Sequence, residues 1–334
     1  MNKKILSSDI LLIITAAIWG FGFVAQRFGM NYVGPFTFNA IRFPLGSLSL
    51  MPLILFLGKK QEKEIKAAER KILFSSSLIA GSCLFIAVAL QQLGLMATTA
   101  GNGGFITGLY VIFTPILGIF LGRKTGKATW AGAVLTFAGL YIISAASQFG
   151  GLNIGDIVVA ISAVFWAFHV LAIDRLVQKT DPIKLSAGQF LVAGFFSLVA
   201  AIIFEPALSV WLGNSGSELQ SAGLFSWESF PNLIKGLASG TVSPSFIKSA
   251  AIPILYGAIA SAGIGYTLQV VAQKNAPPAH ATIILCLEGS FAVFGGFLLL
   301  NEPLGIKTIV GFALMLSGML VSQFELIAGS RKNA

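Results

Sequence analysis

The sequence contains few charged residues and only two cysteines. Charged side chains make up 10% of the 334 residues, whereas a soluble domain carries roughly 25%. Cys83 and Cys286 lie inside apolar runs and lack the spacing of a disulfide framework or a metal cluster. A glycine-rich phosphate loop, a nucleophile elbow and a His-Glu metal motif are also missing. We therefore expect neither a soluble domain nor an enzyme, and no cofactor or metal.

Long apolar runs dominate the sequence instead. Hydrophobic residues form 55% of the chain, and runs of about 18 or more residues, enough to cross a ~30 Å hydrocarbon layer as a helix, recur along it. The runs are continuously apolar and do not alternate as membrane strands do. We expect an all-α polytopic membrane protein with ten transmembrane helices. The expected spans are 9–27, 35–57, 72–93, 99–121, 128–145, 154–174, 184–204, 250–272, 280–299 and 304–323.

The basic residues indicate how these spans are oriented. Net charge is +9, but most Lys and Arg residues fall in alternate connections, such as the segment 58–71, on the same side as both termini. Basic residues concentrate on the cytoplasmic side of membrane proteins, so this bias predicts cytoplasmic termini. The expected location is the cell membrane, which is the inner membrane in a Gram-negative bacterium. Because the charge is explained by topology, we expect a lipid bilayer and no nucleic acid as partner.

The two halves of the sequence resemble each other. ITAAIWGFGFVAQRF at 14–28 matches ISAVFWAFHVLAIDR at 161–175. The repeat-equivalent pairs are Trp19 with Trp166, Arg42 with Gln189, Phe43 with Phe190, Gly132 with Gly311 and Gly139 with Gly318. Because each half holds an odd number of spans, the second would enter the membrane in the opposite sense. The sequence predicts two inverted five-helix repeats at 1–147 and 152–325, an arrangement found in many secondary transporters.

Four segments together resemble the EamA-type members of the drug/metabolite transporter superfamily. They are AAIWGFGFVAQRF, NAIRF, YTLQVVAQKNAPPAHATIILCLEGSF and LLLNEPLG, and the resemblance covers nearly the whole chain. It implies ten helices, cytoplasmic termini and the export or exchange of small organic solutes such as amino acids and related metabolites. The sequence departs from the family pattern at Gly289, where Pro is common after the Glu, and at Arg123, where the family has an acidic residue.

Two charged residues are predicted to lie deep in the membrane, Arg42 in the second span and Glu288 in the ninth. Their expected depths differ by less than ~10 Å. An unpaired ion at such depths is costly, so one hypothesis is that both face a cavity between the halves and bind the substrate or each other. The alternatives are that Arg42 extends to the outer headgroups, or that the two residues form a purely structural pair.

Further candidate substrate-binding residues lie on the spans expected around the same cavity. These are Trp19, Asn39, Gln91, Tyr110, Trp166, His169, Gln189, Tyr266 and Gln269. The Trp rings would suit an apolar or cationic group, and His169 could carry a proton. Ordinary packing and hydrogen bonds between helices are the alternative interpretations.

The segment 205–249 is far longer than the other connections and is predicted to lie outside the cell. Four apolar residues in it recur at helical spacing, which predicts a short amphipathic helix at the membrane interface. They are Trp227, Phe230, Ile234 and Leu237. The alternatives are a tolerated insertion and a lid over the cavity.

The sequence as a whole favours a secondary transporter that exports or exchanges a small-molecule substrate by alternating access. No ATP-binding motif is found, so the energy would come from exchange or from an ion gradient, with protons as the candidate coupling ion. The alternative function is a membrane scaffold or sensor that keeps the transporter fold without flux.

Overall fold

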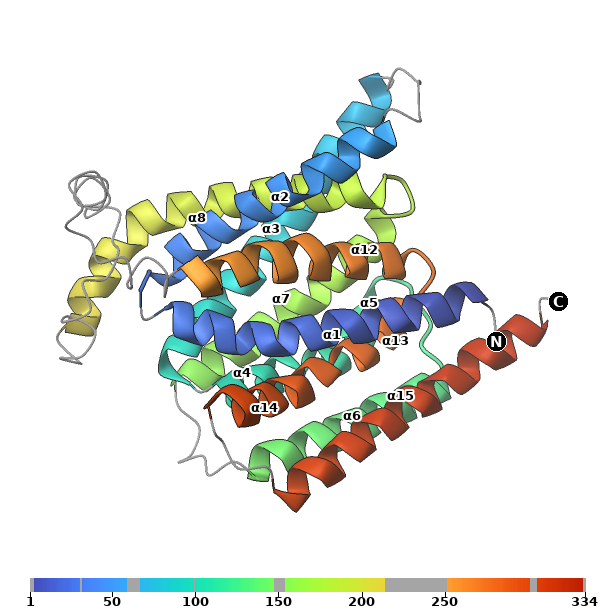
Figure 1. Ribbon diagram of the computed structural model, residues 1–334. Helices are drawn as coiled ribbons and strands as arrows, with labels where there is room; N and C mark the ends of the chain where they lie inside the picture. The colour runs from blue at the N-terminus through green and yellow to red at the C-terminus, as the bar shows by residue number, and fades with distance from the viewer. Residues whose placement is uncertain are drawn as a thin grey trace.

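The structure is a computed structural model, and it describes residues 3–30, 32–58, 67–98, 100–146, 154–213, 251–300 and 305–332. These residues form helices and no β-strand (Figure 1). The prediction of an all-α fold is therefore confirmed.

The described residues of the first half form six helices. They are α1 (Lys3–Gly29), α2 (Pro35–Gly58), α3 (Ala67–Ala97), α4 (Ala100–Thr107), α5 (Tyr110–Phe120) and α6 (Lys127–Ala146). The second half contains α7 (Ile154–Leu176), α8 (Pro182–Gly213), the π-helix η1 (Tyr256–Tyr266), α12 (Thr267–Gln273), α13 (Pro278–Leu285), α14 (Leu287–Leu300) and α15 (Ile306–Lys332).

Eight segments of the described chain are long and apolar enough to cross a membrane, from Ile5–Gly29 to Pro278–Leu299. Many of their outward side chains are apolar and exposed, with Phe120 83% and Phe74 70% accessible. Apolar surface on this scale suits lipid rather than water, and the protein is a multi-pass membrane protein. Helices α6 and α15 occupy the fifth and tenth expected spans but are not among the eight, so the total of ten stays a prediction.

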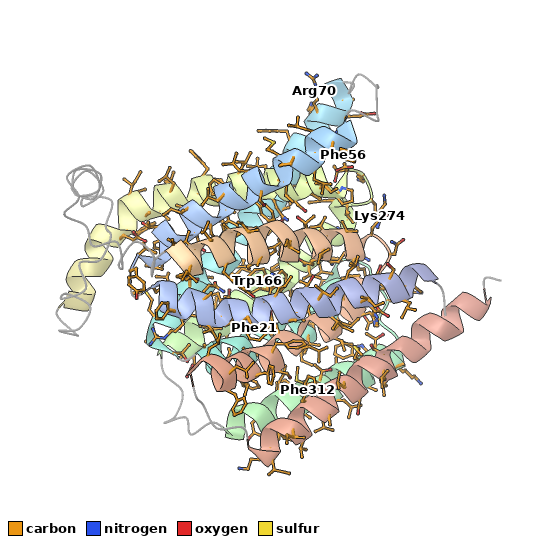
Figure 2. The ribbon with its side chains drawn as sticks, viewed as in Figure 1. Phe21, Phe56, Arg70, Trp166, Lys274 and Phe312 are labelled. Carbon is orange, nitrogen blue, oxygen red and sulfur yellow. The ribbon has the colours of Figure 1, made fainter. Side chains whose placement is uncertain are left out.

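The helices form one bundle in which α2 and α8 pack together on one side and α6 and α15 on the opposite side (Figure 1). Helix α1 runs between these two pairs and contacts α14, η1 and α12. The start of α1 and the end of α15 lie at the same end of the bundle. Figure 2 shows Arg70 and Lys274 toward that end and Trp166 in the interior.

Helices α6 and α15 meet along a glycine seam, defined here as Gly132, Gly139, Gly311 and Gly318. A Cβ atom added to Gly132 would lie 2.6 Å from the carbonyl oxygen of Gly318, and one added to Gly139 would lie 2.5 Å from that of Gly311. The two backbones therefore touch without side chains between them, which is how small residues allow membrane helices to pack closely.

Two of the expected spans are interrupted near their middle by an irregular helical turn. Helix α4 ends at Thr107 and α5 begins at Tyr110, while α13 and α14 are separated at Cys286. Gly108 favours the first break because glycine is a poor helix former, and a Cβ atom there would lie 2.8 Å from Leu140. The thiol of Cys286 donates a hydrogen bond to the carbonyl of Gly108 at 3.2 Å. Both segments still form long apolar spans, Gly103–Phe120 and Pro278–Leu299, close to the expected spans 99–121 and 280–299.

The N-terminus of α2 is capped by a carboxylate from another helix. Glu205 Oε1, on α8, accepts hydrogen bonds from the amides of Phe36 and Thr37 at 2.8 Å, and its Oε2 accepts one from the Thr37 hydroxyl at 2.5 Å. The first amides of a helix have no partner within the helix and favour a negative charge. Helix α8 ends at Gly213, and the rest of the segment 205–249, with the short helix predicted near Trp227, lies outside the described residues.

Candidate functional site

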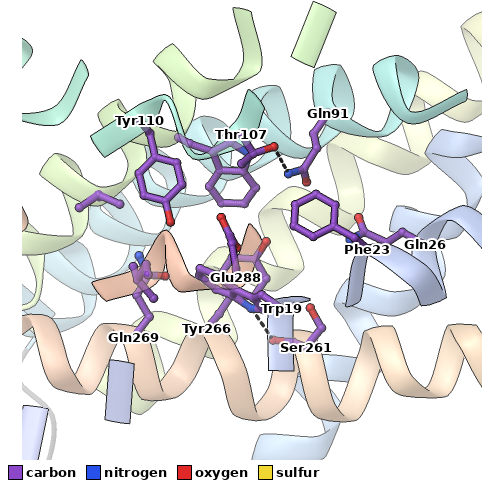
Figure 3. A pocket seen from close by; sticks show the side chains of 13 residues that line it. Trp19, Phe23, Gln26, Gln91, Thr107, Tyr110, Ser261, Tyr266, Gln269 and Glu288 are labelled. Carbon is purple, nitrogen blue, oxygen red and sulfur yellow. Dashed lines mark hydrogen bonds between the residues drawn. The ribbon is translucent and has the colours of Figure 1, made fainter. Parts of the chain in front are cut away.

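A polar cavity lies inside the bundle, and helices from both halves of the chain form its wall (Figure 3). The space between the lining side chains is narrow in this conformation, and part of it is open to the outside. The lining residues are Trp19, Phe23, Gln26, Gln91, Thr107, Tyr110, Trp166, Val170, Ser261, Tyr266, Gln269, Leu285 and Glu288.

The two helix breaks bring four of these residues to the cavity. Thr107 ends α4 and Tyr110 begins α5, whereas Leu285 ends α13 and Glu288 lies in the first turn of α14. Irregular backbone at membrane depth is tolerated where it is buried in protein or borders a cavity. Broken helices of this kind form the binding sites of many secondary transporters.

Three aromatic rings from different helices pack together at the cavity, and we call Trp19, Trp166 and Tyr266 the aromatic group. The ring of Trp19 lies 4.5 Å from that of Tyr266 and 6.2 Å from that of Trp166, and the rings of Trp166 and Tyr266 stack at 6.0 Å. The indole of Trp19 also donates a hydrogen bond to the carbonyl of Ser261 at 3.4 Å, so the π-helix η1 fixes the position of this ring.

Glu288 is the one charged side chain among the described residues that line the cavity. It is 3% exposed and forms no ion pair within the described part of the chain. Its carboxyl group interacts electrostatically with Tyr110 and Tyr266. The Tyr110 hydroxyl nevertheless has no hydrogen bond of ordinary geometry, so we assign proximity but no fixed bond between the two groups.

Several polar atoms of the cavity wall lack a hydrogen-bond partner in the described structure. They are Gln26 Oε1, Tyr110 Oη, Trp166 Nε1 and Gln269 Oε1. Buried polar groups in proteins are almost always hydrogen-bonded, to protein or to water. Four such atoms around one cavity indicate that water or a polar ligand supplies the missing partners.

Seven of the eleven candidate binding residues line the cavity. They are Trp19, Gln91, Tyr110, Trp166, Tyr266, Gln269 and Glu288. Gln91 donates to the Thr107 hydroxyl at 3.0 Å, which joins α3 to the end of α4. Asn39, Arg42, His169 and Gln189 are buried behind the wall instead. Whether any of the eleven binds a substrate stays a prediction.

Arg42 is only 1% exposed, packs beside Gly257 of η1 and interacts electrostatically with Tyr266. Its Nε donates to Asn39 Oδ1 at 2.8 Å, and its guanidinium carbon lies 4.7 Å from the ring centre of Phe43. Arg42 and Glu288 form no ion pair, so the hypothesis that these two charges bind each other is wrong in this structure. The reason is the orientation of Arg42 toward Asn39 and Phe43. A fully buried guanidinium also does not reach the outer headgroups, which was the alternative.

His169 and Gln189 form a buried pair behind the aromatic group. Their side chains are joined at 2.9 Å between His169 Nε2 and Gln189 Oε1. The imidazole packs edge-on against the rings of Trp166 and Tyr266. His169 thus has the position of a packed core histidine, with no direct contribution to the cavity wall.

Six lining residues were not predicted from the sequence. They are Phe23, Gln26, Thr107, Val170, Ser261 and Leu285. Thr107 directly precedes Gly108, so a glycine in the middle of a span was a signal for the break beside it. Gln26 is a polar residue near the end of its span, where polarity alone does not distinguish a cavity from the membrane interface.

Comparison with known proteins gives a family match in both halves of the chain. The profile of the family described as "EamA-like transporter family" matches residues 6–145 and 153–323. A solved structure titled only "Crystal structure of protein" superposes with a TM-score of 0.69 at 17% identity, covering 95% of this chain and 96% of that one. At that identity the superposition supports the fold alone.

Relatives with curated names are also transporters. An uncharacterized transporter of Archaeoglobus fulgidus is 28% identical over 60% of this chain, and the match spans 61% of that relative's own length. A second one from the same organism is 23% identical over 96% of this chain and 98% of its own. Mouse solute carrier family 35 member F6 is 22% identical over 64% of each chain. The motifs, the two family matches and these relatives agree that the chain belongs to the EamA-like transporter family of the drug/metabolite transporter superfamily.

Proposed function

We propose that the protein is a secondary transporter that moves small organic metabolites, such as amino acids or related compounds, across the cell membrane by alternating access. The observation that carries this proposal is the polar cavity, because its wall combines α1, α3, α4 and α5 with α7, η1 and α12 to α14. A cavity between two sets of helices can open to either side when the sets tilt against each other.

Contacts between repeat-equivalent residues support an inverted repeat. In a two-fold arrangement, residues near the axis meet their own equivalents, and more distant residues meet in exchanged pairs. Trp19 meets Trp166, and Phe43 meets Phe190 with ring centroids 6.0 Å apart.

At the glycine seam, each residue contacts the repeat equivalent of the other residue in its half, and not its own equivalent. Gly132 meets Gly318 and Gly139 meets Gly311, whereas the sequence repeat aligns Gly132 with Gly311 and Gly139 with Gly318. The two family matches at 6–145 and 153–323 agree with the same division of the chain. We therefore retain ten spans in two inverted repeats as part of the proposal.

Orientation and coupling follow from the charges. Arg70 and Lys274 lie toward the end of the bundle where α1 starts and α15 ends, and by the positive-inside rule this end is cytoplasmic.

Protons are the candidate coupling ion because Glu288 is a buried acid inside the proposed transport path. Such acids serve as proton carriers in many membrane transporters.

The proposal is tested by reconstituting the purified protein into liposomes and measuring counterflow of labelled amino acids and amines. Ser261→Trp adds a bulky ring to the cavity wall and should reduce counterflow at least about tenfold by blocking the path. Phe120→Trp enlarges a side chain that is 83% exposed on the outer surface and should keep wild-type flux. Size-exclusion chromatography shows whether both variants remain folded.

Folded wild-type protein without counterflow of any solute would favour the scaffold or sensor function. Equal flux in the Ser261→Trp variant and the wild type would show that this cavity is not the path.

A further inference from the structure

We infer that the cavity recognises its substrate through a primary ammonium group, which binds between the carboxylate of Glu288 and the faces of the aromatic group. The inference rests on the proposed transport function and narrows its substrate class. It is carried by the charge of the cavity, by its aromatic faces and by the free hydrogen-bonding atoms in its wall.

The charge of the wall favours a cationic ligand. Among the described lining residues Glu288 is the one carboxylic acid, and no Lys, Arg or His is among them. The guanidinium of Arg42 interacts electrostatically with Tyr266, but it is turned to Asn39 and the ring of Phe43 and does not line the cavity. An ionised carboxylate at membrane depth requires a counter-charge. Among the described residues no cation is paired with Glu288, so a cationic ligand would supply that charge.

The aromatic group supplies the second part of the site. Trp19, Trp166 and Tyr266 come from three helices, yet their ring centres lie within 6.2 Å of one another. Figure 3 shows the Glu288 side chain in the cavity close to Tyr266 and Tyr110, in agreement with its electrostatic interaction with both. Aromatic faces attract ammonium ions, Trp most strongly, and several rings together form cages for such ligands.

The free glutamine oxygens specify hydrogen-bond donors on the ligand. Gln273 donates to the carbonyl of Val170 at 3.0 Å, which orients its amide so that Oε1 accepts from Gln269 at 2.9 Å. The unpartnered atom of Gln269 is therefore an acceptor. Gln26 donates to the carbonyl of Gly22 at 3.2 Å, so its unpartnered atom is an acceptor by the same reasoning.

A primary ammonium group carries three donors and no acceptor, so the carboxylate of Glu288 suits it. The two glutamine oxygens lie on opposite sides of Glu288 (Figure 3) and suit donors elsewhere on the ligand. The remaining free atoms, Tyr110 Oη and Trp166 Nε1, are donors suited to a hydroxyl or carbonyl oxygen elsewhere on the ligand. The described residues of the wall offer no cation for a substrate carboxylate, so an amine fits this charge balance better than a zwitterionic amino acid.

The test compares three probes of similar size by calorimetric titration of the purified protein. The probes are butylammonium, butyramide and butyrate, which are cationic, neutral and anionic. We expect butylammonium to bind wild-type protein about tenfold or more tightly than the other two, a difference of about 1.4 kcal/mol. Glu288→Gln should lose this preference, because the amide keeps the shape of the side chain and removes its charge.

Glu205→Gln is the matched control, because Glu205 is also a buried glutamate but caps α2 and does not line the cavity. It should keep wild-type affinity for butylammonium. Trp166→Leu is a second variant, used with Glu288→Gln or in its place if that protein does not fold, and it should weaken butylammonium binding about fivefold by removing a cation-binding face.

The inference is overturned if butyramide or butyrate binds wild-type protein as well as butylammonium, if no probe binds, or if both cavity variants keep wild-type affinity for butylammonium. Counterflow in the same preparation separates this failure from that of the proposed function. Flux of neutral or anionic solutes without recognition of ammonium would contradict the inference and keep the proposed transport function. Absence of all flux would contradict the transport function itself.

Discussion

Phe43 of α2 and Phe190 of α8 stack with ring centroids 6.0 Å apart and planes inclined by 20°. Both are completely buried, and they occupy equivalent positions in the two halves of the sequence. This contact joins the halves directly beside the aromatic group, because both rings also pack against Tyr266. The two stacked rings therefore pack directly behind Tyr266 of the cavity wall.

We predict that Phe43 and Phe190 stabilise the fold cooperatively. In a double-mutant cycle of Phe43→Leu and Phe190→Leu, we expect a coupling energy of about 0.5 to 1.5 kcal/mol, as found for aromatic pairs. The measurement is reversible unfolding in mixed micelles. Strictly additive effects of the two substitutions would mean that the stacking contributes nothing beyond the burial of each ring.

The glycine seam predicts a position-dependent effect of one methyl group. Gly132→Ala would place a Cβ atom 2.6 Å from the Gly318 carbonyl oxygen, so we expect the helices to separate and the melting temperature to fall by several degrees, corresponding to about 1 to 3 kcal/mol. Gly101→Ala is the matched control, since nothing lies within 4 Å of a Cβ atom there. An equal melting temperature in the two variants would contradict close packing at the seam.

Glu205 is predicted to hold the start of α2. Glu205→Ala would leave two buried amides without their acceptor, and such a loss costs about 1 to 3 kcal/mol for each unsatisfied group. Thr37→Val removes only the hydroxyl contact and should have a smaller effect on the free energy of unfolding. Hydrogen exchange at Phe36 and Thr37 reports the cap directly, and unchanged protection of these amides in Glu205→Ala would contradict it.

We predict that Asn39 stabilises the fold because its side-chain oxygen accepts a hydrogen bond from the buried Arg42. In Asn39→Ala the Nε donor of a buried guanidinium loses the Asn39 oxygen as its acceptor, and we expect a loss of about 1 to 3 kcal/mol in the free energy of unfolding. Asn39→Asp should be more stable than Asn39→Ala, because a carboxylate beside a buried guanidinium forms a stronger, charge-assisted bond. If the two variants unfold at the same denaturant concentration, the hydrogen bond is not important for stability.

The sequence predicted the class of fold and part of the site for identifiable reasons. Apolar length is sufficient to recognise membrane helices, and a buried acid such as Glu288 stands out because charges are rare in such segments. Trp19 and Trp166 were found through the repeat, and they prove to be neighbours at the cavity.

The remaining features depend on information that one sequence does not carry. Rotation of a span about its axis is set by the neighbouring helices, so the direction of Arg42 toward Asn39 could not be predicted from its depth. The interruption at Cys286 lies beside a hydrogen bond to Gly108, which is distant in sequence. Ser261 lines the cavity within a π-helix, a form for which the chain has no simple sequence signal.

The backbone contact between α6 and α15 also limits how the protein can move. Side chains between two helices can change rotamer and let the helices slide, but a seam of touching main chains offers no such freedom. We expect α6 and α15 to move together as one rigid body during a transport cycle, while the other helices change their orientation relative to this pair. A spin label on each of the two helices should then report one constant separation, whichever face of the membrane the cavity opens to.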